Sequence, residues 1–128
     1  MRLRLGFTLI ELLVVLIVLG ILFSIAVPGV LGVRRRAYDS VAQAHLREAV
    51  AYQFTYATEH GDYADELGKL ESEGLRRVPG VELELRSGGA SFCMLVRHAR
   101  GRYWYAATPE KVVNTGVPAR NPAPSDCP

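Results

Sequence analysis

The chain has 128 residues, of which 49% are hydrophobic, 15 are basic and 13 are acidic. This length suits one small domain with one additional element. Arg2 and Arg4 precede Gly6 and every acidic residue follows it, so the rest of the chain holds thirteen basic and thirteen acidic residues. Net charge therefore does not indicate a surface that binds polyanions.

An uncharged, strongly apolar stretch covers residues 12–33. About 20 such residues are enough to cross a bilayer as a helix. A secretory signal peptide cut after Ala26 is one interpretation, but the apolar run continues past Ala26 and Glu11 is unusual in such a segment. A plain membrane anchor explains the length of the run and leaves Glu11 unexplained.

The sequence GFTLIEL, from Gly6 to Leu12, resembles the cleavage and methylation motif of type IV pilins and their pseudopilin relatives. The short leader with two arginines is similar to that of the type IVa group. The resemblance implies that a prepilin peptidase cuts between Gly6 and Phe7 and that the new amine of Phe7 is methylated. It also implies that Glu11 pairs with the amino terminus of a neighbouring subunit during assembly.

The physics of Glu11 agrees with this implication. An unpaired charge at the centre of a membrane helix costs about 2.5–3.5 kcal/mol. Near the start of a helix, the carboxylate can reach the interface and lies at the positive end of the helix dipole. In a dry bundle of helices it needs a partner, and cleavage supplies an amine at Phe7. The alternative is a glutamate that only extends to the interface.

We expect one long helix from Phe7 to about Glu59, ended by Gly61. Gly20 and Pro28 weaken its apolar half, and the family resemblance implies that this region extends inside a filament; a simple kink is the alternative. The second half is amphipathic and is expected to pack on a sheet. The predicted buried stripe is Ala42, Leu46, Ala49, Val50, Phe54 and Ala57.

Residues 61–80 form a connecting segment with a short helix within residues 64–75. Its acidic residues lack the spacing of an EF-hand and are interpreted as solvated. Alternating patterns then predict strands at residues 81–86, 92–96 and 103–107, with a short fourth strand at 111–114 as an extension. This is an antiparallel meander with one face available to the long helix.

The two cysteines, Cys93 and Cys127, fit one disulfide in an oxidising compartment, with two free thiols as the alternative. On the chain-entropy model such a closure is worth roughly 4 kcal/mol. Cys127 would tie the proline-rich tail, residues 108–128, to the second strand. This arrangement resembles the disulfide-bounded C-terminal loop of type IV pilins.

The predicted fold class is therefore α+β: a type IV pilin fold with a helical spine on a sheet of three or four antiparallel strands. The predicted organisation is a leader at residues 1–6, a membrane and filament-core helix at 7–33, and a head at 34–128. Within the head we expect an amphipathic helix at 34–60, a connecting loop at 61–80, a sheet at 81–107 and a disulfide loop at 108–128.

The resemblance implies a structural subunit that polymerises into a type IV pilus and supports twitching motility, adhesion and natural transformation. The alternatives are a pseudopilin of type II secretion or competence machinery, and a minor tip pilin that binds DNA or a surface. The sequence has no Walker loop, zincin motif or paired metal-ligand spacing, so no enzyme, cofactor, metal site or small-molecule substrate is predicted.

The expected partners are further copies of the chain, the prepilin peptidase, the assembly machinery and the inner membrane, with surfaces or DNA as further candidates. Before assembly we expect the head on the periplasmic side, and afterwards in an extracellular pilus. Basic residues flank both ends of the apolar run, so counting charges does not decide the orientation. The placement rests on the leader motif and the cysteine pair.

Overall fold

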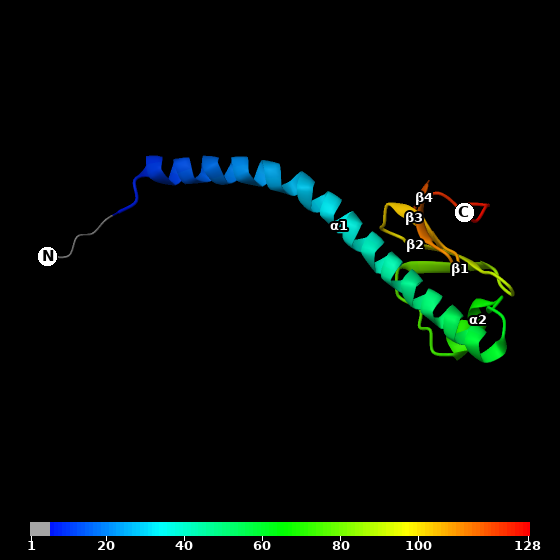
Figure 1. Cartoon of the computed structure of the whole chain (residues 1–128). Helices are drawn as coiled ribbons and strands as arrows, with labels where there is room; N and C mark the ends of the chain where they lie inside the picture. Colours follow the sequence, from blue (N-terminus) through cyan, green and yellow to red (C-terminus); the bar gives the residue numbers. More distant parts are fainter. Residues whose placement is uncertain (1–5) are drawn as a thin grey trace. The chain divides into compact units, whose positions relative to one another are not determined.

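The structure is a computed structural model that describes residues 6–128. Arg2 and Arg4 of the predicted leader lie outside the described residues. The chain divides between Arg34 and Arg35 into two compact units. The elements are α1 (Leu9–His60), α2 (Leu67–Ser72), β1 (Val81–Ser87), β2 (Cys93–His98), β3 (Tyr103–Ala107) and β4 (Val112–Pro118), as Figure 1 shows.

Both ends of α1 are set by local chemistry. The helix begins at Leu9 and not at Phe7, because the hydroxyl oxygen of Thr8 accepts the N–H of Glu11 at 3.2 Å and caps the first turn. At the other end, Gly61 has a φ of +88° and donates its N–H to the carbonyl of Ala57 at 2.8 Å. This left-handed glycine stops the helix as the sequence predicts.

The face of α1 that packs on the sheet differs from the predicted stripe. Ala42, Leu46, Ala49 and Gln53 are each 0% exposed, whereas Phe54 is 44% exposed. Successive helical residues are about 100° apart, so the face that contains Ala42 and Ala49 continues to Gln53. The prediction of Phe54 was wrong because it assumed that the buried stripe is wholly apolar.

Gln53 is buried because it holds the segment that follows α1. Its Oε1 accepts the N–H of Ala64 at 2.8 Å, and its Nε2 donates to the carbonyl of Ala64 at 3.0 Å. Gly88 contacts the same segment so closely that a Cβ there would lie 2.3 Å from the carbonyl oxygen of Ala64. Only glycine fits this approach, so the end of α1, the connecting segment and the β1–β2 turn are fixed together.

The four strands form an antiparallel meander in the order β1-β2-β3-β4. The first three strands confirm the predicted meander. The prediction ended the sheet at residue 107, with a short fourth strand at 111–114 as an extension. The fourth strand is longer than predicted, because β4 continues to Pro118. The pairing of β3 with β4 shifts register between Tyr103 and Tyr105, and Gly116 in β4 has a φ of +75°. The resulting bulge allows β4 to continue through a sequence that is typical of a turn.

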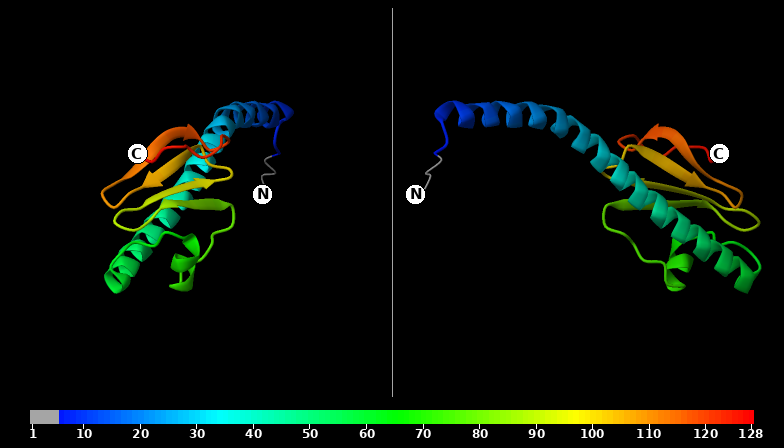
Figure 2. Two further views of the ribbon diagram at one scale, coloured as in Figure 1. Left: turned by 90° about the vertical axis from the view of Figure 1, so that its right-hand side faces the viewer. Right: turned by 60° about the vertical axis from the view of Figure 1, so that its left-hand side comes forward.

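Each face of the sheet has its own buried cluster. Met94, Val96 and Tyr105 pack with the buried residues of α1 on one face. Leu95, Trp104 and Ala106 alternate with them and form a second cluster on the other face. Figure 2 shows the strands between the second half of α1 and the C-terminal segment.

The C-terminal segment covers the second cluster and is fixed in place. Trp104 is 1% exposed, and its indole N–H donates to the carbonyl of Asn121 at 3.0 Å. The guanidinium of Arg97 lies 4.8 Å from the centre of the Trp104 ring and donates to the carbonyl of Ala119. A disulfide joins Cys93 to Cys127. The helix, the antiparallel sheet and the disulfide-closed tail confirm the predicted α+β fold class.

Asp39 attaches the beginning of the head portion of α1 to the β2–β3 turn. It is 6% exposed, and its Oδ1 accepts the backbone N–H of Arg102 at 2.7 Å. Burial raises the pKa of the Tyr105 phenol, and the negative charge of Asp39 raises it further. The hydrogen bond from Arg102 to the buried carboxylate of Asp39 therefore holds the β2–β3 turn in place.

Gln53→Ala removes both side-chain hydrogen bonds to Ala64. We expect the free energy of unfolding of the head to fall by about 2–4 kcal/mol, because two buried backbone groups lose their partners. Chemical denaturation of the full chain in detergent, followed by circular dichroism, measures this loss. Thr55→Ala is the control, since its hydroxyl bonds only the exposed carbonyl of Ala51. Equal stabilities of the two variants would contradict the assignment.

Cys127→Ser releases the tail from β2. We expect a loss of about 4 kcal/mol on the chain-entropy model. Trp104 is the single tryptophan, so iodide quenching of its fluorescence reports whether the tail still covers the second cluster. Quenching should rise in the variant and equally in the wild-type chain treated with a thiol reductant. Unchanged quenching in both would show that the tail stays in place without the disulfide.

Candidate assembly surface

The apolar half of α1 presents an uncovered hydrophobic surface. All residues from Gly6 to Ala37 are exposed, including Phe23 at 65% and Ile25 at 73%. Among the described residues, α1 is the helix long and apolar enough to cross a membrane; its most apolar 18-residue window has a mean hydropathy of 3.0 and no buried residue. Full burial of each such side chain is worth about 1.5–3 kcal/mol, so this surface favours contact with lipid or other protein.

The residues of the predicted cleavage site lie just before the helix. Gly6 and Phe7 are exposed and outside α1, and Phe7 is 83% exposed. A peptide bond in such a segment is accessible to a protease without unwinding a helix. The structure therefore brings Gly6 and Phe7 to an open position next to Thr8.

Glu11 lies in the first turn of α1, where Thr8 accepts its N–H. The side chain of Glu11 has no hydrogen bond or ion pair with any residue that the structure describes. Thr8 belongs to the motif at residues 6–12, but its role as the cap of α1 was not predicted from the sequence. Its signal was the spacing T-L-I-E, in which a threonine cap is followed three residues later by a glutamate, as in a capping box.

Gly20 and Pro28 both lie within the continuous helix. Pro28 has no N–H, so the carbonyl of Ser24 lacks its usual helical donor. A Cβ at Gly20 would meet nothing within 4 Å. Within residues 6–128, no packing of the single chain requires this glycine. Extension of this region in a filament stays a prediction.

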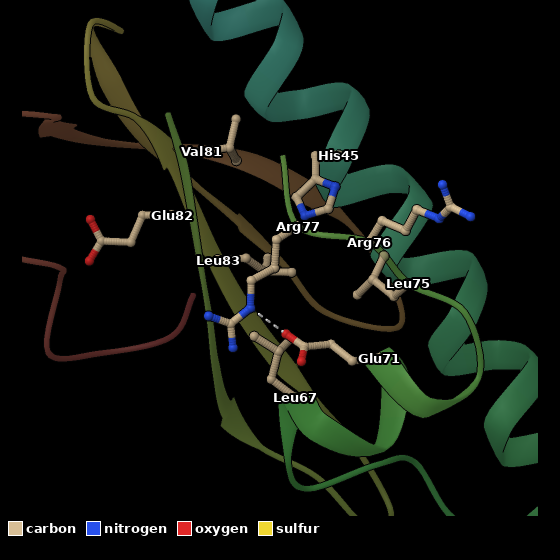
Figure 3. A pocket seen from close by; sticks show the side chains of 9 residues that line it. All are labelled: His45, Leu67, Glu71, Leu75, Arg76, Arg77, Val81, Glu82 and Leu83. Carbon is tan, nitrogen blue, oxygen red and sulfur yellow. Dashed lines mark hydrogen bonds and ion pairs between the residues drawn. The ribbon is translucent and has the colours of Figure 1, made fainter. Parts of the chain in front are cut away.

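A separate hollow of about 260 Å³ lies between α1, α2 and β1 (Figure 3). His45, which is 5% exposed, lines it, and its Nδ1 has no hydrogen-bond partner among the described residues. Figure 3 shows Arg77 paired with Glu71 across the hollow, at 2.7 Å. Leu67, Leu75 and Leu83 are among the other residues that line it. The imidazole has no nucleophile within hydrogen-bond distance in the part of the chain described here.

The acidic residues that follow α1 remain at the surface. Asp65 is exposed, and the ammonium of Lys69 lowers the pKa of its carboxyl through a side-chain hydrogen bond. Glu59, His60 and Glu73 bring ligand atoms within 4.8 Å of one another, and all three are exposed. Exposed clusters of this kind are common on protein surfaces, so the geometry alone does not indicate a metal site.

Comparison with known proteins agrees with the geometry. The prokaryotic N-terminal methylation motif matches residues 1–27. Over 131 aligned residues, the chain is 39% identical to the type IV wide pilus major component PilA4 of Thermus thermophilus, and the match covers 100% of both proteins. Over 74 residues it is 35% identical to the type IV major pilin protein PilA of Myxococcus xanthus, covering 56% of this chain and 34% of that protein.

The chain belongs to the type IV pilins. The full-length match establishes the family, and the helix, sheet and disulfide described above have the expected form. The resemblance inferred from residues 6–12 is confirmed.

Proposed function

We propose that this chain is the repeating structural subunit of a type IV pilus. The observation that carries the proposal is a fully exposed apolar helix joined to a head whose own two cores are complete. The head needs no partner to bury its sheet, whereas the helix does. Packing many such helices together buries them, and repetition of one heterologous contact produces an open fibre. The similarity to two major pilin proteins supports the same function.

Processing is proposed to divide the chain into three parts. A prepilin peptidase removes residues 1–6, residues 7–33 form the membrane anchor and filament core, and residues 34–128 form the head. The open position of Gly6 and Phe7 supports the cleavage site, and the methylation motif over residues 1–27 supports modification of Phe7. The division of the chain between Arg34 and Arg35 lies one residue from the proposed boundary.

Glu11 is proposed to pair with the amine of Phe7 on a neighbouring subunit. Its side chain has no partner among the described residues, and Thr8 already satisfies its backbone N–H. A carboxylate that enters a dry helical bundle needs a counter-charge. Cleavage creates that charge only on a processed chain. With this pairing, assembly depends on cleavage, because only a processed subunit supplies the amine of Phe7.

The region from Gly20 to Pro28 is proposed to lose helicity in the filament. The missing hydrogen bond at Pro28 and the open space beside Gly20 support this. We place the head on the periplasmic side before assembly, since its disulfide suits an oxidising compartment. Twitching motility, adhesion and a contribution to natural transformation are proposed roles of the fibre. No small-molecule substrate, cofactor or enzymatic reaction is part of this function.

Recovery of surface filaments tests the proposal directly. We expect long fibres in which this chain is the most abundant protein, with an N-terminal residue that is methylated Phe7. Electron microscopy and mass spectrometry of sheared fibres measure these features. An N-terminus at Val27 would instead indicate a conventional signal peptide. A short periplasmic structure without surface fibres would indicate a pseudopilin.

Glu11→Ala tests the pairing. We expect normal membrane insertion but fibre yield reduced on the order of a hundredfold or more, because loss of one partner of a buried ion pair costs about 3–5 kcal/mol. Membrane fractionation and quantification of sheared fibres measure the two steps. Glu59→Ala is the matched control, since Glu59 is an exposed glutamate at the other end of α1. Normal fibres from Glu11→Ala would exclude the pairing.

A further inference from the structure

Four arginines from three segments line one hollow in the unit Arg35–Pro128. Its volume is about 410 Å³. It lies between the beginning of this unit, the β2–β3 turn and the residues after β4. Its lining includes Arg35, Arg100, Arg102 and Arg120, with Tyr103 and Pro118. No acidic residue of the described chain lines it.

The backbone around this hollow is held by hydrogen bonds that do not involve the arginine side chains. The N–H of Ala99 donates to the carbonyl of Gly80 at 2.8 Å, and that of Gly101 to His98 at 2.9 Å. The N–H of Ala119 donates to the carbonyl of Arg102 at 2.9 Å, which keeps the tail beside the turn. The backbone that carries Arg100, Arg102 and Arg120 is therefore held in place.

The positive charge of this hollow is not neutralised within the described residues. Elsewhere in the head, Arg77, Arg86 and Arg97 each lie within 2.7 Å of a glutamate oxygen. The four arginines of the hollow have no such ion pair with any residue from 6 to 128. The nearby carboxylate of Asp39 is buried and accepts the backbone N–H of Arg102. Arginines that line one hollow without an ion pair favour an anion that can accept several hydrogen bonds, above all a phosphate.

The position of the hollow along the chain indicates where a phosphate bound in it would lie. Arg35 follows Val33, the last residue of the uncharged apolar run, by two positions. At 1.5 Å per residue in a helix, this is a separation of about 3 Å along the axis. A chain inserted through its apolar run thus holds Arg35 at the membrane surface, whichever side the head occupies.

One tyrosine lines the hollow and another contacts one of its arginines, and both fit the same environment. The guanidinium of Arg100 lies 6.0 Å from the ring centre of Tyr38, and that of Arg102 lies 5.3 Å from the ring centre of Tyr103. Tyrosine is enriched where membrane and water meet, because its ring is amphipathic. Arginine and tyrosine together therefore match a lipid headgroup region better than bulk water.

We propose that this hollow binds the phosphate of an anionic phospholipid headgroup while the chain is anchored in the membrane. The proposal rests on the anchoring part of the proposed function and does not require filaments. The arginines surround the phosphate and the tyrosines lie at the level of the headgroups. Extraction of the subunit then includes release of this lipid.

The test uses the full-length chain in a neutral detergent. Native mass spectrometry measures binding of phosphatidylglycerol and of phosphatidylcholine with the same acyl chains. We expect a clear preference for phosphatidylglycerol, and a loss of about fivefold in its affinity for each arginine removed in Arg100→Gln/Arg102→Gln. Both substitutions keep the backbone hydrogen bonds of the turn. Arg77→Gln/Arg86→Gln removes the same charge elsewhere and should keep the preference.

Several outcomes would overturn the proposal. Equal binding of both lipids, or equal losses in the two double variants, would show that the hollow has no role in selecting the lipid. Displacement of the lipid by glycerol phosphate at equal concentration would indicate a site for free phosphate. Stronger arginine-dependent binding of a DNA duplex, or dimers that need Arg100 and no lipid, would assign the hollow to nucleic acid or to a second copy. Because binding is measured before assembly, a chain that forms no fibres still gives an answer.

Discussion

The exposed apolar half of α1 is the constraint on which the rest of the molecule depends. Exposure of this surface to water is unfavourable, because more than twenty successive uncharged residues are accessible to solvent. Lipid covers this surface in a membrane-anchored precursor, and in the proposed fibre neighbouring helices cover it. Among the described residues Glu11 has no partner, and the proposed pairing supplies one only where helices gather after cleavage. In this proposal, membrane insertion and polymerisation each remove the same apolar surface from water.

The small sheet of the head must be stable without a contribution from the apolar half of α1. Both faces of the sheet are buried, one beneath the second half of α1 and the other beneath the C-terminal segment. The bonds from Gln53 to Ala64 and from Trp104 to Asn121 fix the connecting segment after α1 and the C-terminal segment through backbone groups. A domain of this size gains from such fixation because its apolar core alone contributes little net stability.

The regular elements and the general form of the assembly surface could be predicted from periodicity and from the motif at residues 6–12. The parts that could not be predicted depend on contacts between distant residues. Gln53 is polar and is buried only because Ala64 lies beside it. β4 passes through Gly116, whose role in a bulge depends on the pairing with β3. The arginines of the hollow come together only through folding of the turn and tail.

Cys127 lies 34 residues after its disulfide partner Cys93, and this separation sets an order of events. A chain made from its N-terminus exposes the apolar helix first, the strands next, and Cys127 after both. The disulfide that fastens the segment over Trp104 cannot form until residue 127 has been made and has reached an oxidising compartment. A chain cut short before Cys127 keeps its apolar helix, but the segment over the second cluster is then held without a covalent bond. The disulfide therefore distinguishes a subunit whose tail is covalently fastened from one whose tail is not.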